Sequence, residues 1–413
     1  MSQASVNCDV LIVGGGLVGL SLANALSQVA VSCVLVEARN PNLLQQQSFD
    51  GRVTALANGS KGILEQLGLW GHLREHAVGI HSVHIGEQGR FGAARINAAD
   101  EGVDVLGYTL ENRVLGKVLW QEVANHPRFN CIAPAKLISF SADTDAIVAT
   151  IERDDKTCSV AAKLMIAADG ANSFVRRALG ISAREDDYGQ QALIVNCTTE
   201  MEHKGRAFER FTKHGPLAVL PLSAGRSSIV WTLEHPDASR IMALGDDQFR
   251  YELQRSFGYR LGKFRRVGSR DLHTLRRVRS DALSDTRTLL IGNAALSVHP
   301  VAGQGFNLAL RDVATITEII ADEISREPQQ GDIGAARVLN RYGQWRAYDQ
   351  RTVAWFTHGL IRCFGMTLPG LGILRGLGLA AFDLAPGAKR LLARHTMGMS
   401  GHLPRLARGL GLS

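Results

Sequence analysis

One stretch near the beginning of the chain constrains the fold more than any other. Residues 8–13 form an apolar run typical of a buried strand, GGGLVG follows at 14–19, and a second apolar run over 31–36 ends at Glu37. A strand, a glycine turn, a helix and a second strand, with an acidic residue about twenty positions after the glycines, form the context in which this motif binds a dinucleotide. The sequence therefore predicts a Rossmann-like unit.

Each residue of this motif has a physical task. Gly14 permits the tight turn, Gly16 lets a pyrophosphate approach the backbone, and Gly19 allows the helix to pack closely on the sheet. Glu37 is placed to accept hydrogen bonds from an adenosine ribose. No second motif of this kind follows in the sequence, so a single site would hold either FAD or NAD(P).

A second stretch, residues 289–312, combines a short apolar strand, a glycine-rich loop and the start of an apolar-periodic helix near Phe306. Gly303 and Gly305 let the backbone approach a ligand, and a helix start presents free N–H groups with a partial positive charge. This pattern favours an electron-rich ligand, although an ordinary strand–loop–helix crossover has the same features.

A third stretch places Asp169 directly after a buried strand over 164–168 and Ser173 at the start of a helix. Ser173 suits a helix N-cap, so the run is either a simple capped turn or a further contact to an extended cofactor. Arg52 lies in a loop and could be solvated or bind a phosphate. The periodicity also predicts helices over 61–73 and 108–123, with Arg113 near the start of the second.

Residues 181–287 differ in pattern, because several runs alternate between apolar and polar side chains. Such alternation predicts an antiparallel sheet inserted into the α/β domain, and this sheet could form the floor of a substrate pocket. A helix is expected over 247–257, and the arginine-rich segment 265–279 is typical of a solvated face.

The net charge of +7 over 413 residues comes from the C-terminal part of the chain. From residue 351 onward the only acid is Asp383, and its apolar windows are too short to span a bilayer. This basic tail fits either surface association with an anionic membrane or a partner complex, or helices that close the core. The six cysteines form no CxxC pair or Cys/His cluster, which indicates free thiols in a reducing compartment and predicts no metal site.

Taken together, these motifs resemble the group A flavin monooxygenases, the aromatic hydroxylases related to p-hydroxybenzoate hydroxylase. The matching pieces are GGGLVG with Glu37, Arg113, DGANSFVR at 169–176 and IGNAALSVHPVAGQGFNLALRD at 291–312. HPVAGQGFNLALRD, FDGRVTALA and GRAFERFTKHGPLAVLPL are most similar to the ubiquinone-biosynthesis hydroxylase subfamily. The chain departs from the broad family at Asn293, where the family has an aspartate; an amide can make comparable hydrogen bonds without charge.

The resemblance implies FAD as the bound cofactor and NAD(P)H as a transient co-substrate. It assigns the adenosine end of FAD to Gly14, Gly16, Gly19 and Glu37, the pyrophosphate region to Arg52, Arg113 and Asp169, and the ribityl and isoalloxazine end to Asn293, Gly303, Gly305 and Asn307.

The fold that the resemblance implies is α/β: a Rossmann-like FAD-binding domain with an inserted antiparallel β-sheet substrate domain, p-hydroxybenzoate hydroxylase-like, and a helical C-terminal region. The expected division is 1–75, 105–180 and 286–350 for the FAD-binding domain, 76–104 and 181–285 for the substrate domain, and 351–413 for the C-terminal helical basic region.

The implied activity is ring hydroxylation of a polyprenylated phenol, such as 2-polyprenyl-6-methoxyphenol, with O2 and NAD(P)H through a flavin C4a-hydroperoxide. Other ubiquinone-biosynthesis proteins are candidate partners, no nucleic acid is expected, and the location is cytoplasmic or peripheral to the inner membrane. Two alternatives stay open: a sister hydroxylase acting at another ring position, and an FAD-bearing subunit without turnover. The catalytic base is unassigned, and His299, His214 and Arg210 are candidates by position only.

Overall fold

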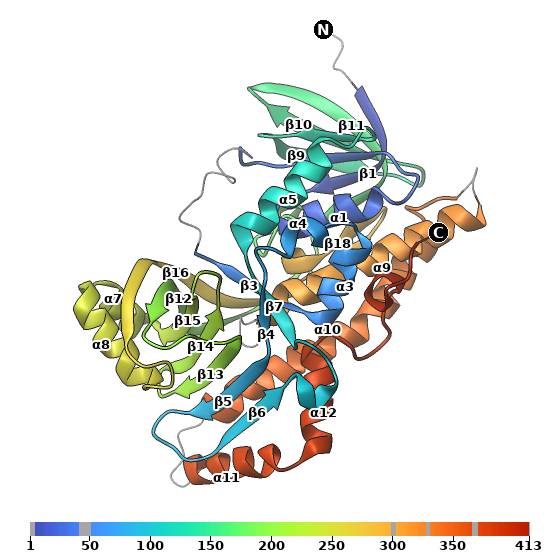
Figure 1. Ribbon diagram of the computed structural model, residues 1–413. Helices are drawn as coiled ribbons and strands as arrows, with labels where there is room; N and C mark the ends of the chain where they lie inside the picture. The colour runs from blue at the N-terminus through green and yellow to red at the C-terminus, as the bar shows by residue number, and fades with distance from the viewer. Residues whose placement is uncertain (1–4, 41–50, 299–302, 328–330, 366–370, 413) are drawn as a thin grey trace.

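The computed structural model describes residues 5–40, 51–298, 303–327, 331–365 and 371–412, without the side chains of residues 348, 353–365 and 371–375. Within these residues the chain forms two large sheets and one small sheet, with helices packed around them (Figure 1).

The first sheet carries the predicted Rossmann-like unit. Its strand order is β17-β18-β11-β1-β2-β8, and β10 and β9 extend it beside β11. Strand β1 is parallel to both β11 and β2, and its apolar end from Val10 to Val13 is buried, as a strand covered on both faces requires. The strands are β1 (Ser5–Val13), β2 (Cys33–Val36), β8 (Phe129–Ile132), β9 (Lys136–Ala142), β10 (Ile147–Arg153), β11 (Lys156–Ala167), β17 (Ser284–Asp285) and β18 (Thr288–Leu290).

Three helices cover one face of this sheet and share one hydrophobic core with it: α1 (Leu17–Leu26), α5 (Asn112–Ala124) and α9 (Gln304–Arg326). The strand, glycine turn, helix and strand predicted at the start of the chain are thereby confirmed. Short helix α6 (Phe174–Ala178) follows β11, and Ser173 caps it as predicted, because its hydroxyl accepts the N–H of Arg176 at 3.0 Å.

The second sheet has the order β19-β16-β12-β15-β14-β13-β5-β6 and is antiparallel except for the parallel pair β13–β5. Helices α7 (His235–Met242) and α8 (Asp246–Phe257) pack on one of its faces. The strands are β5 (Ser82–Glu87), β6 (Ala93–Asn97), β12 (Ala183–Thr199), β13 (Arg206–Thr212), β14 (Gly215–Pro221), β15 (Arg226–Glu234), β16 (Phe264–Ser280) and β19 (Leu296–Ser297).

Two predicted helices differ from the structure, one because its first residues pair with distant strands and the other because a glycine interrupts it. The helix expected over 108–123 begins only at Asn112; residues 107–111 form β7 (Gly107–Glu111), which pairs with β3 (Val53–Ala57) and β4 (Val78–Ile80) in the small sheet. The helix over 61–73 is split into α3 (Asn58–Gln66) and α4 (Trp70–Leu73), with Gly68 at φ +74° between them. The arginine-rich segment lies on strand β16, where Arg265, Arg266, Arg276 and Arg279 are exposed, as expected for a solvated face.

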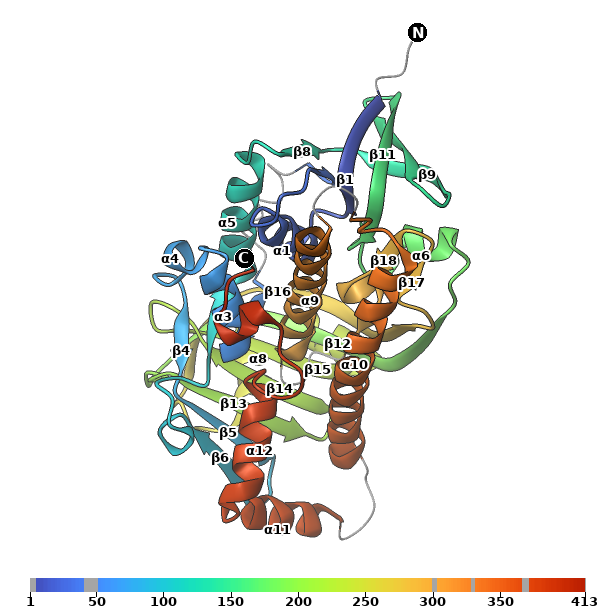
Figure 2. The same cartoon turned by 90° about the vertical axis from the view of Figure 1, so that its right-hand side faces the viewer.

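The C-terminal region is helical, as predicted. It contains α10 (Ala336–Gly365), α11 (Leu371–Asp383), α12 (Pro386–Thr396) and the 3-10 turn η4 (Arg405–Arg408); α11 lies beside β5 and β6 (Figure 2). Leu406 and Leu412 are buried in the core around α3 and α9, and Arg405 pairs with Glu318 and Asp322. Part of the basic tail therefore closes the core. No helix in the described ranges is both long and apolar enough to cross a bilayer.

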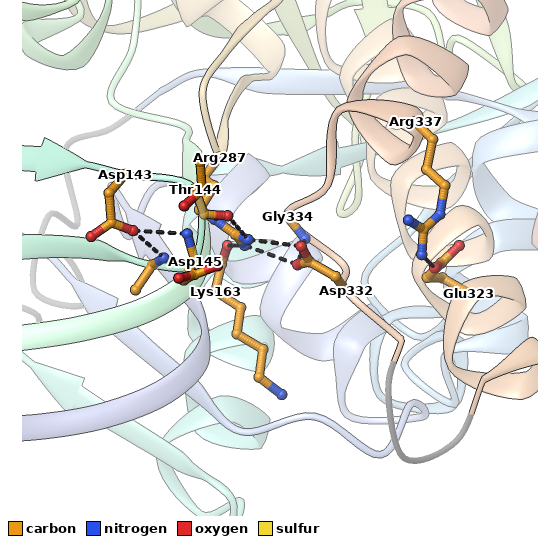
Figure 3. A network of polar contacts seen from close by, with 10 residues as sticks. Asp143, Thr144, Asp145, Lys163, Arg287, Glu323, Asp332, Gly334 and Arg337 are labelled. Carbon is orange, nitrogen blue, oxygen red and sulfur yellow. Dashed lines mark hydrogen bonds and ion pairs between the residues drawn. The ribbon is translucent and has the colours of Figure 1, made fainter.

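Arg287 joins the turn between β9 and β10 and strand β11 of the first sheet to the segment that precedes α10 (Figure 3). Its guanidinium makes two hydrogen bonds to Asp332, at 2.8 and 2.7 Å, and donates to the carbonyls of Thr144 and Lys163. The arginine is buried and Asp332 is half-buried. Burial raises the pKa of Asp332, but the hydrogen bonds from Arg287 and Gly334 outweigh it and hold that pKa below its usual value.

We expect Arg287→Met to lower the free energy of unfolding by about 3 kcal/mol, because it removes the guanidinium hydrogen bonds to Asp332 and to two carbonyls. Since the pKa of folded Asp332 is depressed, this contribution is present above the ordinary aspartate pKa and is lost as the pH falls through the folded value. Denaturant unfolding at pH 7 and at decreasing pH measures both effects.

The matched control is Arg153→Met, which removes an exposed ion pair with Asp154 at 3.5 Å on the neighbouring strand β10. Its expected cost is under about 1 kcal/mol. Equal losses in the two variants would contradict the role assigned to Arg287.

Candidate cofactor and substrate site

One cavity of about 1690 Å³ joins the glycine loop of the first sheet to the inner face of the second sheet. At one end it is lined by the loop before α1, by β3, by the start of α5 and by the start of α9. At the other end it is lined by β5, β6, β12, β13, β14 and β15, and by α11 and α12. The cavity therefore connects the predicted cofactor and substrate sites.

The glycines of the first loop have distinct surroundings. Gly14 has φ +106°, and a Cβ there would come within 2.6 Å of the Ala168 carbonyl oxygen. A Cβ at Gly19 would overlap the carbonyl oxygen of Gly14, so the lack of a side chain at this position lets the helix pack closely against the turn. Gly16 lines the cavity, and no atom of the described residues lies within 4 Å of a Cβ built there. Open space over Gly16 fits the close approach of a pyrophosphate.

Glu37 is buried behind this loop and orients it. Its carboxylate accepts the N–H of Gly15 at 2.5 Å and the N–H of Arg39 at 2.8 Å. Carboxylate oxygens accept more than one hydrogen bond each, so the remaining lone pairs can serve a ribose. Glu37 itself lies behind the residues that line the cavity, and its contact with a ribose stays a prediction.

Two helices begin at the cavity without a side-chain cap. The N-cap of α1 is Gly16 and the N-cap of α9 is Gly303, which has φ +61°; neither helix has an acidic residue in its first turn. The first N–H groups of a helix have no partner within the helix, and the helix dipole adds positive potential there. Both ends therefore suit anionic groups, such as a pyrophosphate at α1 and a reduced flavin at α9.

Asp169 and Asn307 lie behind the cavity wall. One oxygen of Asp169 accepts the Val175 N–H at 3.2 Å, and its Oδ1 is buried with no hydrogen-bond partner among the described residues. An unpartnered buried acceptor fits a hydroxyl donor from a bound group. Asn307 instead bonds the backbone of Ala55, Ala57 and Gly303 at 2.8 to 2.9 Å. It thereby holds β3 against α9.

Basic side chains gather at the same end of the cavity. Arg52 and Arg113 line it, and so do Arg39 and Lys117, which the sequence analysis had not singled out. Arg113 is held by Glu111 at 2.7 Å. Burial raises the pKa of Glu111, but its hydrogen bonds with Arg113 and Arg226 outweigh burial and lower that pKa. The carboxylate stays ionised and keeps Arg113 at the cavity.

Of the residues predicted to bind FAD, some line the cavity and others stand behind it. The lining residues are Gly16, Arg52, Arg113, Asn293, Gly303 and Gly305; those behind are Gly14, Gly19, Glu37, Asp169 and Asn307. Asn293 is exposed to the cavity at the 3-10 turn η2 (Gly292–Ala294). Contacts of these residues with FAD remain predictions.

The positions proposed for a catalytic base do not line the cavity in the described part of the chain. His214 pairs with Asp237 at 2.7 Å, and the Arg210 Nε donates to the Ser256 carbonyl on the outer side of the second sheet. His299 and the neighbouring Pro300 lie outside the described residues.

Known proteins resemble the chain over almost its whole length. A family model for an FAD binding domain matches residues 7–346. The chain is 36% identical over 409 residues to ubiquinone hydroxylase UbiL of Rhodospirillum rubrum, covering 98% of this chain and 93% of that protein. It is 30% identical over 397 residues to 3-demethoxyubiquinol 3-hydroxylase of Escherichia coli, covering 95% and 98%.

Among solved structures, p-nitrophenol 4-monooxygenase PnpA of Pseudomonas putida matches with a TM-score of 0.79 at 18% identity, over 96% of this chain and 99% of that one. The PqsL structure from Pseudomonas aeruginosa matches with a TM-score of 0.73 at 20% identity, over 90% and 99%. These likenesses concern the fold, and they confirm the predicted fold class.

We expect Gly16→Val to weaken FAD binding at least tenfold, or by more than about 1.4 kcal/mol, because its side chain fills the open space over the loop. The folded chain should survive, since a Cβ at this position meets no protein atom. Flavin absorbance of the purified protein and titration of the apoprotein with FAD measure the effect.

The control is Gly71→Val, at an exposed helical glycine that also has open space around it. Gly19→Ala should instead lower the melting temperature of the apoprotein, because of its overlap with Gly14. Wild-type flavin occupancy in Gly16→Val would contradict the assignment of the loop.

Proposed function

The chain belongs to the FAD binding domain family, and we propose that this FAD-dependent monooxygenase hydroxylates the ring of a polyprenylated phenol in ubiquinone biosynthesis, with 2-polyprenyl-6-methoxyphenol as substrate. The observation that carries the proposal is the single cavity that connects the glycine loop with the apolar face of the second sheet. A bound FAD and an aromatic ring with an apolar tail would both find matching walls there.

The residues at the first end of the cavity fit FAD. Gly16 and the start of α1 would receive the pyrophosphate, with Arg39 and Arg52 nearby, and Asn293 and the start of α9 would receive the flavin end. When bound, FAD takes a hydride from NAD(P)H and activates O2 for insertion into the ring. The N–H groups at the start of α9 would stabilise negative charge on the flavin.

The second end of the cavity fits a prenylated ring. A row of directly paired residues crosses six strands of the sheet, and all of them except Glu209 on β13 are apolar: Ile194, Val230, Ala218, Glu209, Ile85 and Ala94. Leu379, Phe382 and Leu392 from the C-terminal helices also line the cavity. An apolar wall of this kind favours burial of a hydrocarbon tail by about 25 cal/mol for each Å² removed from water.

The C-terminal helices provide a route by which such a substrate could enter. Leu391 lines the cavity although 74% of its surface is exposed, and Leu384 on the preceding turn is 83% exposed. Arg394 lines the cavity on the same helix. These features support delivery of the substrate from the surface of the inner membrane, or from another protein of the pathway, to an enzyme in the cytoplasm.

The proposal also specifies which position of the ring is hydroxylated. The names of the two relatives support hydroxylation within ubiquinone biosynthesis, and one of them, 3-demethoxyubiquinol 3-hydroxylase, favours a second candidate that acts at another ring position. Every feature at the FAD end would be shared by both candidates.

We expect purified, FAD-loaded protein to oxidise NAD(P)H faster when 2-prenyl-6-methoxyphenol is added, and to form a product heavier by one oxygen atom from O2. Mass spectrometry with labelled oxygen and comparison of the product with ring isomers test the reaction and its position. Stimulated oxidation without a hydroxylated product would overturn the proposed hydroxylation. No stimulation by any ring precursor of the pathway would overturn it too, and would favour an FAD-bearing subunit without turnover.

A further inference from the structure

We propose that Glu209 is a catalytic residue of the proposed hydroxylation, in which its carboxylate accepts the hydroxyl proton of the bound phenol. This inference rests on the proposed function for the identity of the substrate. The local sequence around Glu209 does not single it out, because a single glutamate in a strand is usually solvated.

Glu209 lies at the centre of the apolar wall of the cavity. Strand β13 alternates, so that Ala207, Glu209 and Phe211 face the cavity, while Arg210 lies on the other side, where its Nε bonds the Ser256 carbonyl. The residues paired with Glu209 on the two adjacent strands are Ala218 and Ile85, which also line the cavity.

No other carboxylic acid lines this cavity in the described part of the chain. Burial in the apolar wall raises the pKa of Glu209 to about 7. The ionisable groups that face the same side from nearby elements are Glu87 at the end of β5, His273 on β16, and Arg394 and His395 on α12. None of these groups offsets the effect of burial on the acid.

An unpaired carboxylate in an apolar wall is costly unless a ligand donates to it. A phenol is such a donor, and its ring and tail match the surrounding side chains. A carboxylate with a pKa close to the working pH is also suited to accept a proton during a reaction. The place of Glu209 in the apolar wall, its isolation from other acids that line the cavity, and its raised pKa therefore all favour a role as proton acceptor.

As the ring carbon forms its bond to one oxygen atom derived from O2, the O–O bond breaks and the second oxygen atom keeps its electron pair. At the same time the phenol O–H bond breaks, its proton passes to a Glu209 oxygen, and its electron pair enters the ring. The newly hydroxylated carbon then releases its hydrogen to solvent as a proton, so that the ring becomes aromatic again, and the phenol oxygen takes a proton back from Glu209. NAD(P)H supplies the two electrons that convert the second oxygen atom of O2 to water.

The first test compares wild-type protein with Glu209→Gln, which keeps the shape of the side chain but cannot accept a proton. We expect kcat/KM with 2-prenyl-6-methoxyphenol to fall about 100-fold. In the wild type kcat/KM should decrease as the pH falls below about 7, because the carboxylate becomes protonated, and Glu209→Gln should lack this decrease. Glu209→Asp should retain the pH dependence with a smaller loss of rate.

The second test measures binding and does not depend on turnover. The dissociation constants of the phenol and of its O-methyl ether, which has no proton to donate, are obtained from changes in flavin absorbance. The wild type should prefer the phenol at least tenfold at pH 8, and Glu209→Gln should lose this preference. Equal preference in both proteins would overturn the proposal even if the hydroxylation is confirmed.

A third measurement separates a buried charge from a misfolded variant. Since the pKa of folded Glu209 is raised, ionisation opposes folding as the pH rises above the ordinary glutamate value. Glu209→Gln should therefore melt at a higher temperature than wild type at pH 8 and at nearly the same temperature at pH 5. Glu202→Gln, at an exposed acid ahead of β13, is the control that should change neither melting nor binding. If the wild type fails to hydroxylate the phenol but binds it with the expected preference, the proposed reaction fails and the contact at Glu209 stands.

Discussion

The buried ion cluster around Arg346 connects the loop below the flavin end of the cavity to the helices behind it. Arg346 is fully buried and contacts Asp312 at 2.6 Å and Asp349 at 2.5 Å. The other oxygen of Asp312 accepts the N–H of Gly292, next to the Asn293 that faces the cavity. Burial alone lowers the pKa of Arg346, but the two carboxylates outweigh it and keep that pKa above its ordinary value.

This cluster does more to fix the positions of the helices and loops that it joins than to raise the free energy of unfolding. A buried ion pair contributes little compared with apolar packing, yet removing one partner costs about 3–5 kcal/mol because a charge is left uncompensated. Arg311 extends the cluster, since it contacts Asp349 at 2.9 Å and donates to the carbonyl of Ser400 in the loop that lines the cavity. Helices α9 and α10, the C-terminal loop and the cofactor loop are thus held in one arrangement.

Short-range sequence patterns were sufficient to predict much of the part of the structure built around the first sheet. The glycine motif, the apolar run of β1 and the cap at Ser173 depend on neighbours within a few residues, so their sequence carries the physical cause of the structure. The error at residues 108–111 has the opposite origin. Those residues show a helical pattern, but pairing with β3 and β4 satisfies their backbone groups in a strand. Asn307 likewise proved to hold β3 rather than to line the cavity.

The chain's local patterns alone determined a dinucleotide-type fold, an inserted sheet and the basic character of the tail. They could not place Glu209, because its isolation is created by Ala218 and Ile85 on other strands, and no residue near it in the chain indicates that environment. The same holds for the shared cavity, whose walls come from segments as distant as Gly16 and Leu392. Burial of Glu209 arises only when these segments meet, so tertiary structure decided which acid among the described residues faces the cavity.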